Sequence, residues 1–342
     1  MPLTFTLSGE DGKERVRKTD APFGRVKFTG LKPGSGYQLI VRQGEKEIVR
    51  QTFRTLPLPA GVLLRGAVLA DPHLTQGPDN PKMRLHSRSA AILRTVRTEL
   101  EKEKTDLLLL PGDVTDRSRV SELKLFQKVF ADAPFAFAAV PGNHDRLASR
   151  EFAAEWKKLF GEPAGYEERN GIQIVRLDTG NGLLNKPGNI EAVKRLDPAK
   201  PALIISHYQL VKDDHITDPD AAVKDADRPE CRAMLKRIAS ARAIVLVGHK
   251  NLATMTEIDG RVPQINCPQT TQYPNGYLVF RLYPEGMLYS YVPASDEWSE
   301  EYSRRLHGSV TAREKHAFRC WNGFLKWPEP VSQKENAEGN AP

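Results

Sequence analysis

Hydrophobic positions in this chain follow two patterns, alternation with polar residues before residue 58 and nearly unbroken apolar runs after residue 61. Five of the runs are short and mostly apolar, at residues 62–70, 107–110, 135–140, 202–206 and 243–247. A strand buried on both faces has a continuous apolar run of this kind, as in a parallel sheet covered by helices. The pattern therefore predicts an α/β region with buried parallel strands.

The residues that follow each of these runs include Asp, Asn or His. They read Asp71-Pro-His73, Gly112-Asp113-Val-Thr-Asp116, Gly142-Asn143-His144-Asp145, His207, and Gly248-His249-Lys250-Asn251. In open α/β sheets the ligand site lies at the carboxyl ends of the strands, so we expect these side chains to meet at one rim. Imidazole and carboxylate groups suit borderline divalent metals, and a shared carboxylate can bridge two of them. A single His after a strand is more often structural, whereas five such strand ends together predict a metal site.

Segments between the runs have apolar residues at helical spacing, and an α/β fold requires strands and helices to alternate. Expected helices cover residues 87–104, 119–130, 150–160 and 229–239, and further expected strands cover 172–177, 277–282 and 287–292. Near the C-terminus, a helix at 309–327 is expected to pack through Phe318, Trp321 and Phe324. The polar tail at 334–342 is expected to be disordered.

Before the linker at residues 56–61, the alternation predicts a small all-β module. Its expected strands centre on Leu3/Phe5/Leu7, Val26/Phe28, Tyr37/Leu39/Val41 and Ile48/Phe53. Residues 28–37 and 53–57 resemble the second half of a fibronectin type III domain, where a Leu, a Pro-Gly turn and a corner Tyr precede the penultimate strand. We therefore expect three parts: a short β-sandwich module at 1–58, the α/β domain at 62–292, and an extension with a helix and a disordered tail at 293–342.

Composition and charge narrow the class of protein. The chain has 342 residues, a formal net charge of +7, and three widely separated cysteines, which favours a reducing compartment over a disulfide framework. The start of the chain lacks the basic-then-apolar pattern of a secretory leader, and no apolar run is long enough to span a bilayer, so a cytoplasmic protein without a membrane partner is expected. Basic residues before residue 60 are scattered and lack interleaved aromatics, which favours a solvated face over a nucleic-acid patch.

In order and spacing, the five strand-end motifs resemble those of the calcineurin-like metallophosphoesterase family, over roughly residues 62–292. The resemblance implies a four-layer α-β-β-α sandwich with two divalent metal ions (Mn, Fe or Zn) at the strand ends and a bridging hydroxide as nucleophile. It implies ligand roles for seven residues: Asp71 and His73 on the first metal, Asp113 as the bridge, Asn143, His207 and His249 on the second metal, and Asn251 at a position that usually completes the first site.

The resemblance also implies roles beside the metals. His144 corresponds to the residue next to the leaving group, acting as general acid or as a donor to phosphate, and Asp116 to its orienting partner. For Asp116 the alternative is a helix N-terminal cap. Arg117 corresponds to an arginine that grips phosphate in the protein-phosphatase branch, with a solvent-facing side chain as an equal alternative. His86, Asp214 and His215 lie in loops long enough to reach the rim, and a surface position is favoured over substrate contact for each.

The last motif departs from the family at one position, because Asn251 stands where a second His is usual. An amide oxygen is a neutral and weaker ligand than imidazole for these metals. Two outcomes follow: a first site of lowered affinity with slower turnover, or loss of the first metal and survival as a binding scaffold. The presence of every other motif residue favours the first outcome.

The opening motif Asp71-Pro-His73-Leu differs from that of purple acid phosphatases. Those enzymes also bind iron through a Tyr in the segment that corresponds to Asp113–Asp116, and this chain has no Tyr there. Together with the loop, helix and Asp113 strand that follow, the opening is most similar to the class III cyclic-nucleotide phosphodiesterase branch. The sequence is thus interpreted as a phosphodiesterase or phosphomonoesterase for a small phosphate ester. The alternatives are a nuclease of the same family, for which nucleic acid would be the partner, and a scaffold without activity.

Overall fold

The computed structural model describes residues 2–21, 25–80, 84–147, 149–214, 216, 218–250, 252–306 and 322–330. It divides into two compact units, Met1–Gly61 and Val62–Pro342. No helix among these described residues is long and apolar enough to cross a membrane.

The first unit contains one antiparallel sheet in the order β2-β1-β3-β4. Its strands are β1 (Leu3–Gly9), β2 (Glu14–Thr19), β3 (Gly36–Gln43) and β4 (Lys46–Arg54). The strand expected around Val26 and Phe28 is wrong, because residues 25–33 form no strand and Phe28 lies under the Arg17 guanidinium, 5.9 Å from ring centre to carbon. A sandwich needs two facing sheets, and the described residues of this unit form one.

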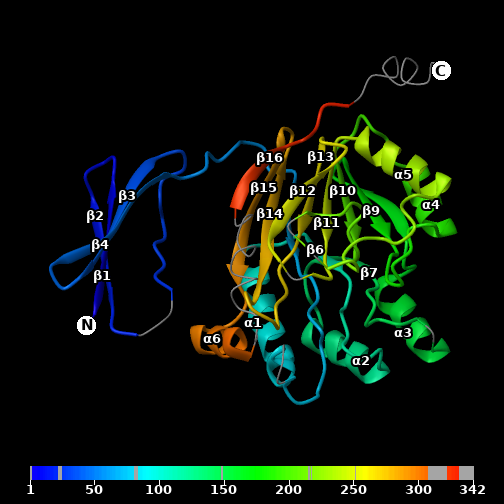
Figure 1. The fold of residues 1–342 in the computed structure, drawn as a ribbon, viewed down its shortest axis with the longest axis horizontal. Helices are drawn as coiled ribbons and strands as arrows, with labels where there is room; N and C mark the ends of the chain where they lie inside the picture. The colour runs from blue at the N-terminus through cyan, green and yellow to red at the C-terminus, as the bar shows by residue number, and fades with distance from the viewer. Residues whose placement is uncertain are drawn as a thin grey trace. The chain divides into compact units, whose positions relative to one another are not determined.

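The second unit contains two six-stranded sheets, in the orders β16-β15-β14-β5-β6-β7 and β12-β13-β11-β10-β9-β8 (Figure 1). The strands are β5 (Leu64–Val68), β6 (Leu107–Pro111), β7 (Ala136–Val140), β8 (Gly165–Arg169), β9 (Ile172–Leu177), β10 (Ala202–Ser206), β11 (Ala243–Val247), β12 (Thr254–Ile258), β13 (Val262–Asn266), β14 (Gly276–Tyr283), β15 (Gly286–Pro293) and β16 (Asn322–Lys326). Strands β5, β6 and β7 are parallel in one sheet, and β9, β10 and β11 in the other. The predicted parallel strands are therefore confirmed but are shared between two sheets.

Alternate residues of each buried strand pack on opposite faces. In β6, Leu107 and Leu109 join a core that both sheets share, whereas Leu108 and Leu110 pack against helices on the other face. Burial on both faces is why this run has no polar position.

Helices pack on the face of each sheet that points away from the shared core (Figure 1). The first sheet is covered by α1 (Ser89–Lys102), α2 (Val120–Val129) and α3 (Arg150–Phe160), and the second by α4 (Pro187–Lys194) and α5 (Pro229–Ala239). The unit also contains the 3-10 turn η1 (His86–Arg88) and helix α6 (Glu297–Leu306). The four helices predicted between residues 87 and 239 are confirmed within a few residues. Helix α4 was not predicted, since it is one of the shortest helices and opens on Pro-Gly.

The expected C-terminal helix at 309–327 is wrong over its last turn. Residues 322–326 form β16, which pairs with β15 at the edge of the first sheet. Trp327 follows it into the shared core, 4% exposed, and its Nε1 donates a hydrogen bond to the Tyr283 carbonyl. The rest of the expected helix, including Phe318 and Trp321, and the tail at 334–342 lie outside the described residues.

Candidate metal centre

Three overlapping groups of His and Asp side chains lie beyond the carboxyl ends of the parallel strands. One group is Asp71, His73 and Asp113, and another is Asp113, His207 and His249; in each, the candidate ligand atoms lie within 4.8 Å of one another. These residues follow β5, β6, β10 and β11, so both sheets contribute. The two groups share Asp113, which is the arrangement that a carboxylate bridging two cations requires.

Glycines permit this close approach. A Cβ added to Gly142 would lie 2.1 Å from Asp113 Oδ1, and one added to Gly248 would lie 2.5 Å from Asp71 Oδ2, both closer than any real Cβ contact. The backbone at the carboxylates is also unusual, because Asp71 and Asp113 have φ of +46° and +51°. Residues other than glycine seldom adopt this left-handed region, and such strain clusters at functional sites.

His207 presents one ring nitrogen to two oxygens. Its Nδ1 lies 3.0 Å from the Pro111 carbonyl, to which it can donate. A neutral imidazole has one N–H, so Nε2 then carries a lone pair, 3.0 Å from Asn143 Oδ1 and 3.5 Å from Asp113 Oδ2. Three lone-pair atoms that converge in this way suit a cation.

Whereas the tautomer of His207 is fixed at Nδ1, that of His249 is fixed by a hydrogen bond at Nε2. Its Nε2 lies 2.9 Å from the Asp220 carbonyl, so Nδ1 is left with the lone pair, and its ring stacks on Tyr208 at 4.1 Å between centroids. Its main-chain N–H donates to both oxygens of the Asp71 carboxylate, at 3.0 and 2.9 Å. A partner on one ring nitrogen orients the other towards a metal.

His73 is fully buried, and neither of its ring nitrogens has a hydrogen-bond partner. Nε2 lies 3.5 Å from Asp113 Oδ2 and 4.0 Å from Asp71 Oδ1. Unpaired buried polar atoms are costly, so an imidazole between two carboxylates fits a ligand of a divalent ion. Asn251, expected at this same site, lies outside the described residues.

Burial sets the protonation of these groups. It lowers the pKa of His73 to about 3 and that of His249 to about 2, and it also lowers the pKa of His207. The three imidazoles are therefore neutral, as metal ligands must be. Burial and the neighbouring Asp113 carboxylate raise the pKa of Asp71, a crowding of negative charge that a dication would relieve.

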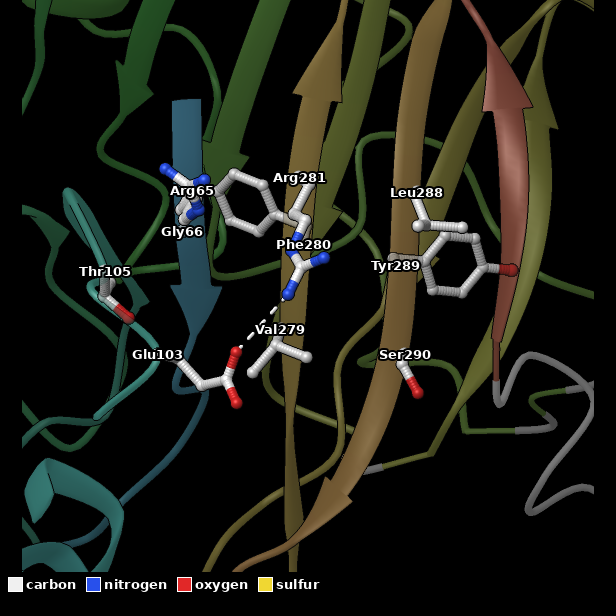
Figure 2. Close-up of a pocket in the computed structure, with 10 residues that line it drawn as sticks. All are labelled: Arg65, Gly66, Glu103, Thr105, Val279, Phe280, Arg281, Leu288, Tyr289 and Ser290. Atoms are coloured by element: carbon white, nitrogen blue, oxygen red, sulfur yellow. Dashed lines mark hydrogen bonds and ion pairs between the residues drawn. The ribbon is translucent and has the colours of Figure 1, made fainter. Parts of the chain in front are cut away.

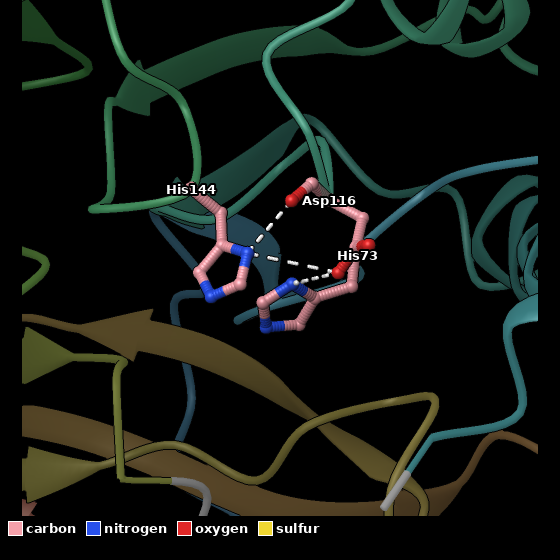
Figure 3. Close-up of side chains that lie close together, drawn as sticks. All are labelled: His73, Asp116 and His144. Carbon is pink, nitrogen blue, oxygen red and sulfur yellow. Dashed lines mark hydrogen bonds and ion pairs between the residues drawn. The ribbon is translucent and has the colours of Figure 1, made fainter. Parts of the chain in front are cut away.

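The third group is His73, Asp116 and His144, shown in Figure 3. The Nδ1 of His144 lies 2.7 Å from the main-chain carbonyl of Asp116, but 3.6 Å from its carboxylate. The main-chain N–H of His144 donates to Asp113 Oδ1 at 2.7 Å. The expected hydrogen bond to His144 is therefore made by the backbone of Asp116 and not by its side chain.

The neighbours of Asp116 differ in part from those that the sequence predicts. The alternative of a helix cap is wrong, because Arg119 occupies the N-cap of α2. Arg117 has a half-exposed side chain whose Nε lies 3.4 Å from Asp116 Oδ2. His86 was expected at the surface but is 4% exposed and lies 3.3 Å from Asp116 Oδ1. The polar stretch after His73 has no periodicity from which the burial of His86 could be predicted. His215 lies outside the described residues.

A pocket with different chemistry lies on the first sheet (Figure 2). Its volume is about 170 Å³, and an ion pair between Arg281 and Glu103 crosses it at 3.4 Å. It is lined by Arg65, Gly66, Glu103, Thr105, Val279, Phe280, Arg281, Leu288, Tyr289 and Ser290. None of the candidate metal ligands contributes to it.

Comparison with known proteins identifies a family for this part of the chain. The sequence model of the family described as calcineurin-like phosphoesterase matches residues 64–269. A probable cyclic nucleotide phosphodiesterase of Vesicomyosocius okutanii is 28% identical over 207 residues, which are 57% of this chain and 85% of the relative. A probable glycerophosphodiester phosphodiesterase of Arcobacter nitrofigilis is 35% identical over 74 residues, and the match spans 22% of this chain and a quarter (25%) of that relative's length.

Solved structures with a similar arrangement are more distant in sequence. A dimetal phosphatase from Danio rerio aligns with a TM-score of 0.49 at 15% identity, over 69% of this chain and 98% of its own. A purple acid phosphatase from yellow lupin aligns with a TM-score of 0.49 at 12% identity, over 86% of this chain and 67% of its own.

Proposed function

Because this chain belongs to the calcineurin-like phosphoesterase family, we propose that it hydrolyses a small phosphate ester with two divalent ions, of Mn, Fe or Zn. The observation that carries the proposal is the carboxylate of Asp113, which two groups of candidate ligand atoms share. Asp71 and His73 would hold the first ion, and Asn143, His207 and His249 the second. Bound ions would act as Lewis acids on phosphate oxygens and lower the pKa of water towards neutrality.

His144 is proposed to serve the leaving group. Its Nδ1 donates to the Asp116 carbonyl, so the ring is held in place and the other nitrogen remains to deliver a proton. The side chain is 30% exposed, more than the buried ligands beside it, and so can reach a substrate. Arg117, with its half-exposed guanidinium next to Asp116, is proposed to contact a phosphate oxygen.

A phosphodiester is the proposed substrate, and a cyclic nucleotide is one candidate. Two relatives are named as phosphodiesterases, one for cyclic nucleotides and one for glycerophosphodiesters, and the longer match spans most of its relative. In this chain the residue at 251 is Asn, so the first site is proposed to bind its metal weakly and turnover to be slow.

The test is a set of phosphate esters with protein reconstituted in Mn²⁺, Fe²⁺ or Zn²⁺. We expect hydrolysis of bis(para-nitrophenyl) phosphate, of para-nitrophenyl phosphate, or of both, with Mn²⁺ giving the highest rate. A nuclease would instead cleave oligonucleotides and bind them with a steep dependence on salt. Protein that binds no metal and cleaves none of these esters would be a scaffold, and the proposal would be wrong.

The two parts of the chain are proposed to have different roles. The sheets and helices of residues 62–330 are read as a four-layer α-β-β-α sandwich that carries the metal centre. The first unit is proposed to be an abbreviated fibronectin type III-like module, since Tyr37 Oη accepts a hydrogen bond from the Lys32 main-chain N–H at 2.8 Å. A corner tyrosine in such domains bonds to the backbone a few residues upstream in the same way.

A further inference from the structure

The carboxylate of Asp116 lies at the centre of a buried cluster that the proposed reaction does not explain. The side chain is 7% exposed, and its Oδ1 lies 3.4 Å from His73 Nδ1, 3.3 Å from His86 Nε2 and 3.6 Å from Arg84 Nη1. These residues come from different segments, the loop after β5, the turn η1 and the loop after β6. A buried carboxylate is stable only when cations or N–H donors surround it. Three nitrogens lie near Oδ1, but none of them makes a hydrogen bond to it.

The ring of His144 is oriented without the Asp116 carboxylate. Its Nδ1 already has a hydrogen-bond acceptor at 2.7 Å, the main-chain carbonyl of Asp116, and a carbonyl survives any substitution at that position. His73 has no such alternative, because neither of its ring nitrogens makes a hydrogen bond in the described residues, and Asp116 Oδ1 lies 3.4 Å from its Nδ1. The side chain of Asp116 is thus placed for His73.

We propose that Asp116, held by His86, is the positioning residue of His73, and that it acts on the first metal site and not on proton transfer by His144. A proton on Nδ1, the nitrogen beside Asp116, would leave the His73 lone pair on Nε2, which lies 3.5 Å from Asp113 Oδ2 and 4.0 Å from Asp71 Oδ1. A carboxylate partner of this kind orients a ligating imidazole and increases its basicity. The inference rests on the proposed two-metal function, and it assigns His86 a role that the motifs do not.

Arg84 completes the cluster. Its guanidinium is 14% exposed, and it supplies a positive charge 3.6 Å from the carboxylate that would otherwise be buried beside Asp113 and Asp71. Arg84 therefore adds a positive charge beside the same oxygen of the Asp116 carboxylate that His73 and His86 approach.

The test compares metal binding with turnover in variants at two positions. Co²⁺ binding is titrated by visible absorption or calorimetry without substrate, and turnover is measured against Mn²⁺ concentration. For Asp116→Ala we expect the weaker of the two metal sites to lose about 10–100-fold in affinity, the usual effect of removing such a partner. The loss of turnover at limiting Mn²⁺ should shrink as Mn²⁺ is raised. Asp116→Asn keeps an acceptor and should lose less.

His86 provides the matched pair. His86→Phe keeps the ring shape without a nitrogen and should weaken the same metal site, whereas His86→Gln places an amide N–H near the position of Nε2 and should restore it. Melting temperatures of the metal-free variants show which of them fold. Because the pair differs in whether an N–H donor is present, the comparison still decides the matter if Asp116→Ala is unstable, provided that both variants fold.

The outcomes separate this inference from the proposed function. If Asp116→Ala and His86→Phe bind two ions as tightly as the wild type and lose turnover as His144→Ala does, Asp116 acts through His144 and the inference is wrong. If the wild type cleaves no ester but Asp116→Ala still weakens Co²⁺ binding, the inference stands and the proposed function fails. If the wild type binds no metal, both are wrong.

Discussion

At the scale of single residues, His144 and the metal ligands make separable contributions. His144 donates to Asp113 Oδ1 through its main-chain N–H, which substitution by alanine keeps, and its ring bonds through Nδ1 to the Asp116 carbonyl and not to a ligand assigned to either metal. We therefore expect His144→Ala to keep its metal content and to lose about 10²–10⁴-fold in turnover, the usual contribution of a positioned proton donor. Elemental analysis beside steady-state kinetics checks this. An equal loss of metal would identify His144 as a ligand.

Asn251 is proposed to stand where the family usually has a second His, and its replacement tests the weakness proposed for the first site. Imidazole is a stronger ligand than an amide for Mn, Fe or Zn, so Asn251→His should tighten the weaker metal site and raise turnover at limiting Mn²⁺. Metal titration by calorimetry measures the first effect. Asn251→Gln, which keeps the amide, is the control and should not tighten the site.

Burial of neutral imidazoles predicts a pH dependence for the metal-free protein. His73 has its pKa lowered to about 3 by burial, whereas an unfolded histidine titrates near 6.5. Between these values the unfolded chain binds more protons, so the contribution of His73 to stability falls as pH decreases, by at most about 1.4 kcal/mol per pH unit. Burial raises the pKa of the Asp71 and Asp145 carboxyls, and these two groups contribute with the opposite sign. The His73 contribution is therefore measured as the difference between the wild type and His73→Gln, from melting temperatures with a chelator between pH 7 and 5. The variant should lose less stability, or gain more, than the wild type as pH falls, and the same pH dependence in both proteins would contradict the assignment.

The residues that sequence could predict are those in strand-end motifs. Asp71, Asp113 and His207 each follow an apolar run, and parallel strands bring such ends together whatever the surrounding loops do. Arg84 and His86 had no such signal, because their positions depend on how the long loop after His73 returns to Asp116. Contacts of this kind are set by tertiary packing and have no period in the sequence.

At the scale of elements, burial on both faces decided what could be predicted. Strands β6, β10 and β11 are completely buried, and their apolar runs gave bounds within a residue or two. Strand β2 reads Glu-Arg-Val-Arg-Lys-Thr and is largely exposed, so its charges concealed it. Strand β16 carries Phe324 and Leu325 at neighbouring positions, and a helical spacing of aromatics was the wrong interpretation.

Trp327 provides a test of how much β16 matters. Its ring is buried in the core between the two sheets, and its Nε1 bonds to the Tyr283 carbonyl at 3.0 Å. Trp327→Ala should lower the free energy of unfolding by about 3–5 kcal/mol, the usual cost of removing a buried aromatic. Trp327→Phe should cost less because it loses the hydrogen bond but keeps most of the packing. Denaturant unfolding measures both, with the exposed Lys326→Ala as control. A cost below about 1 kcal/mol would show that β16 is peripheral.

At the scale of the whole molecule, the metal centre and the first unit belong to different compact parts of the chain. Every described candidate ligand, from Asp71 to His249, lies in the unit that begins at Val62. A unit with its own cores can fold alone, and residues 62–342 contain three large hydrophobic clusters. The chemistry proposed here is therefore expected to reside in the second unit.

Deleting residues 1–61 tests this division. The shortened chain should bind the same number of metal ions and cleave a small nitrophenyl ester within about threefold of the full chain, because no described ligand is removed. Metal analysis and kinetics on both proteins measure this. A selective rise in KM for a larger phosphodiester, with kcat and metal content unchanged, would assign the first unit to substrate binding. Loss of metal from a chain that still melts cooperatively would instead show that the centre depends on the first unit, and the division would be wrong.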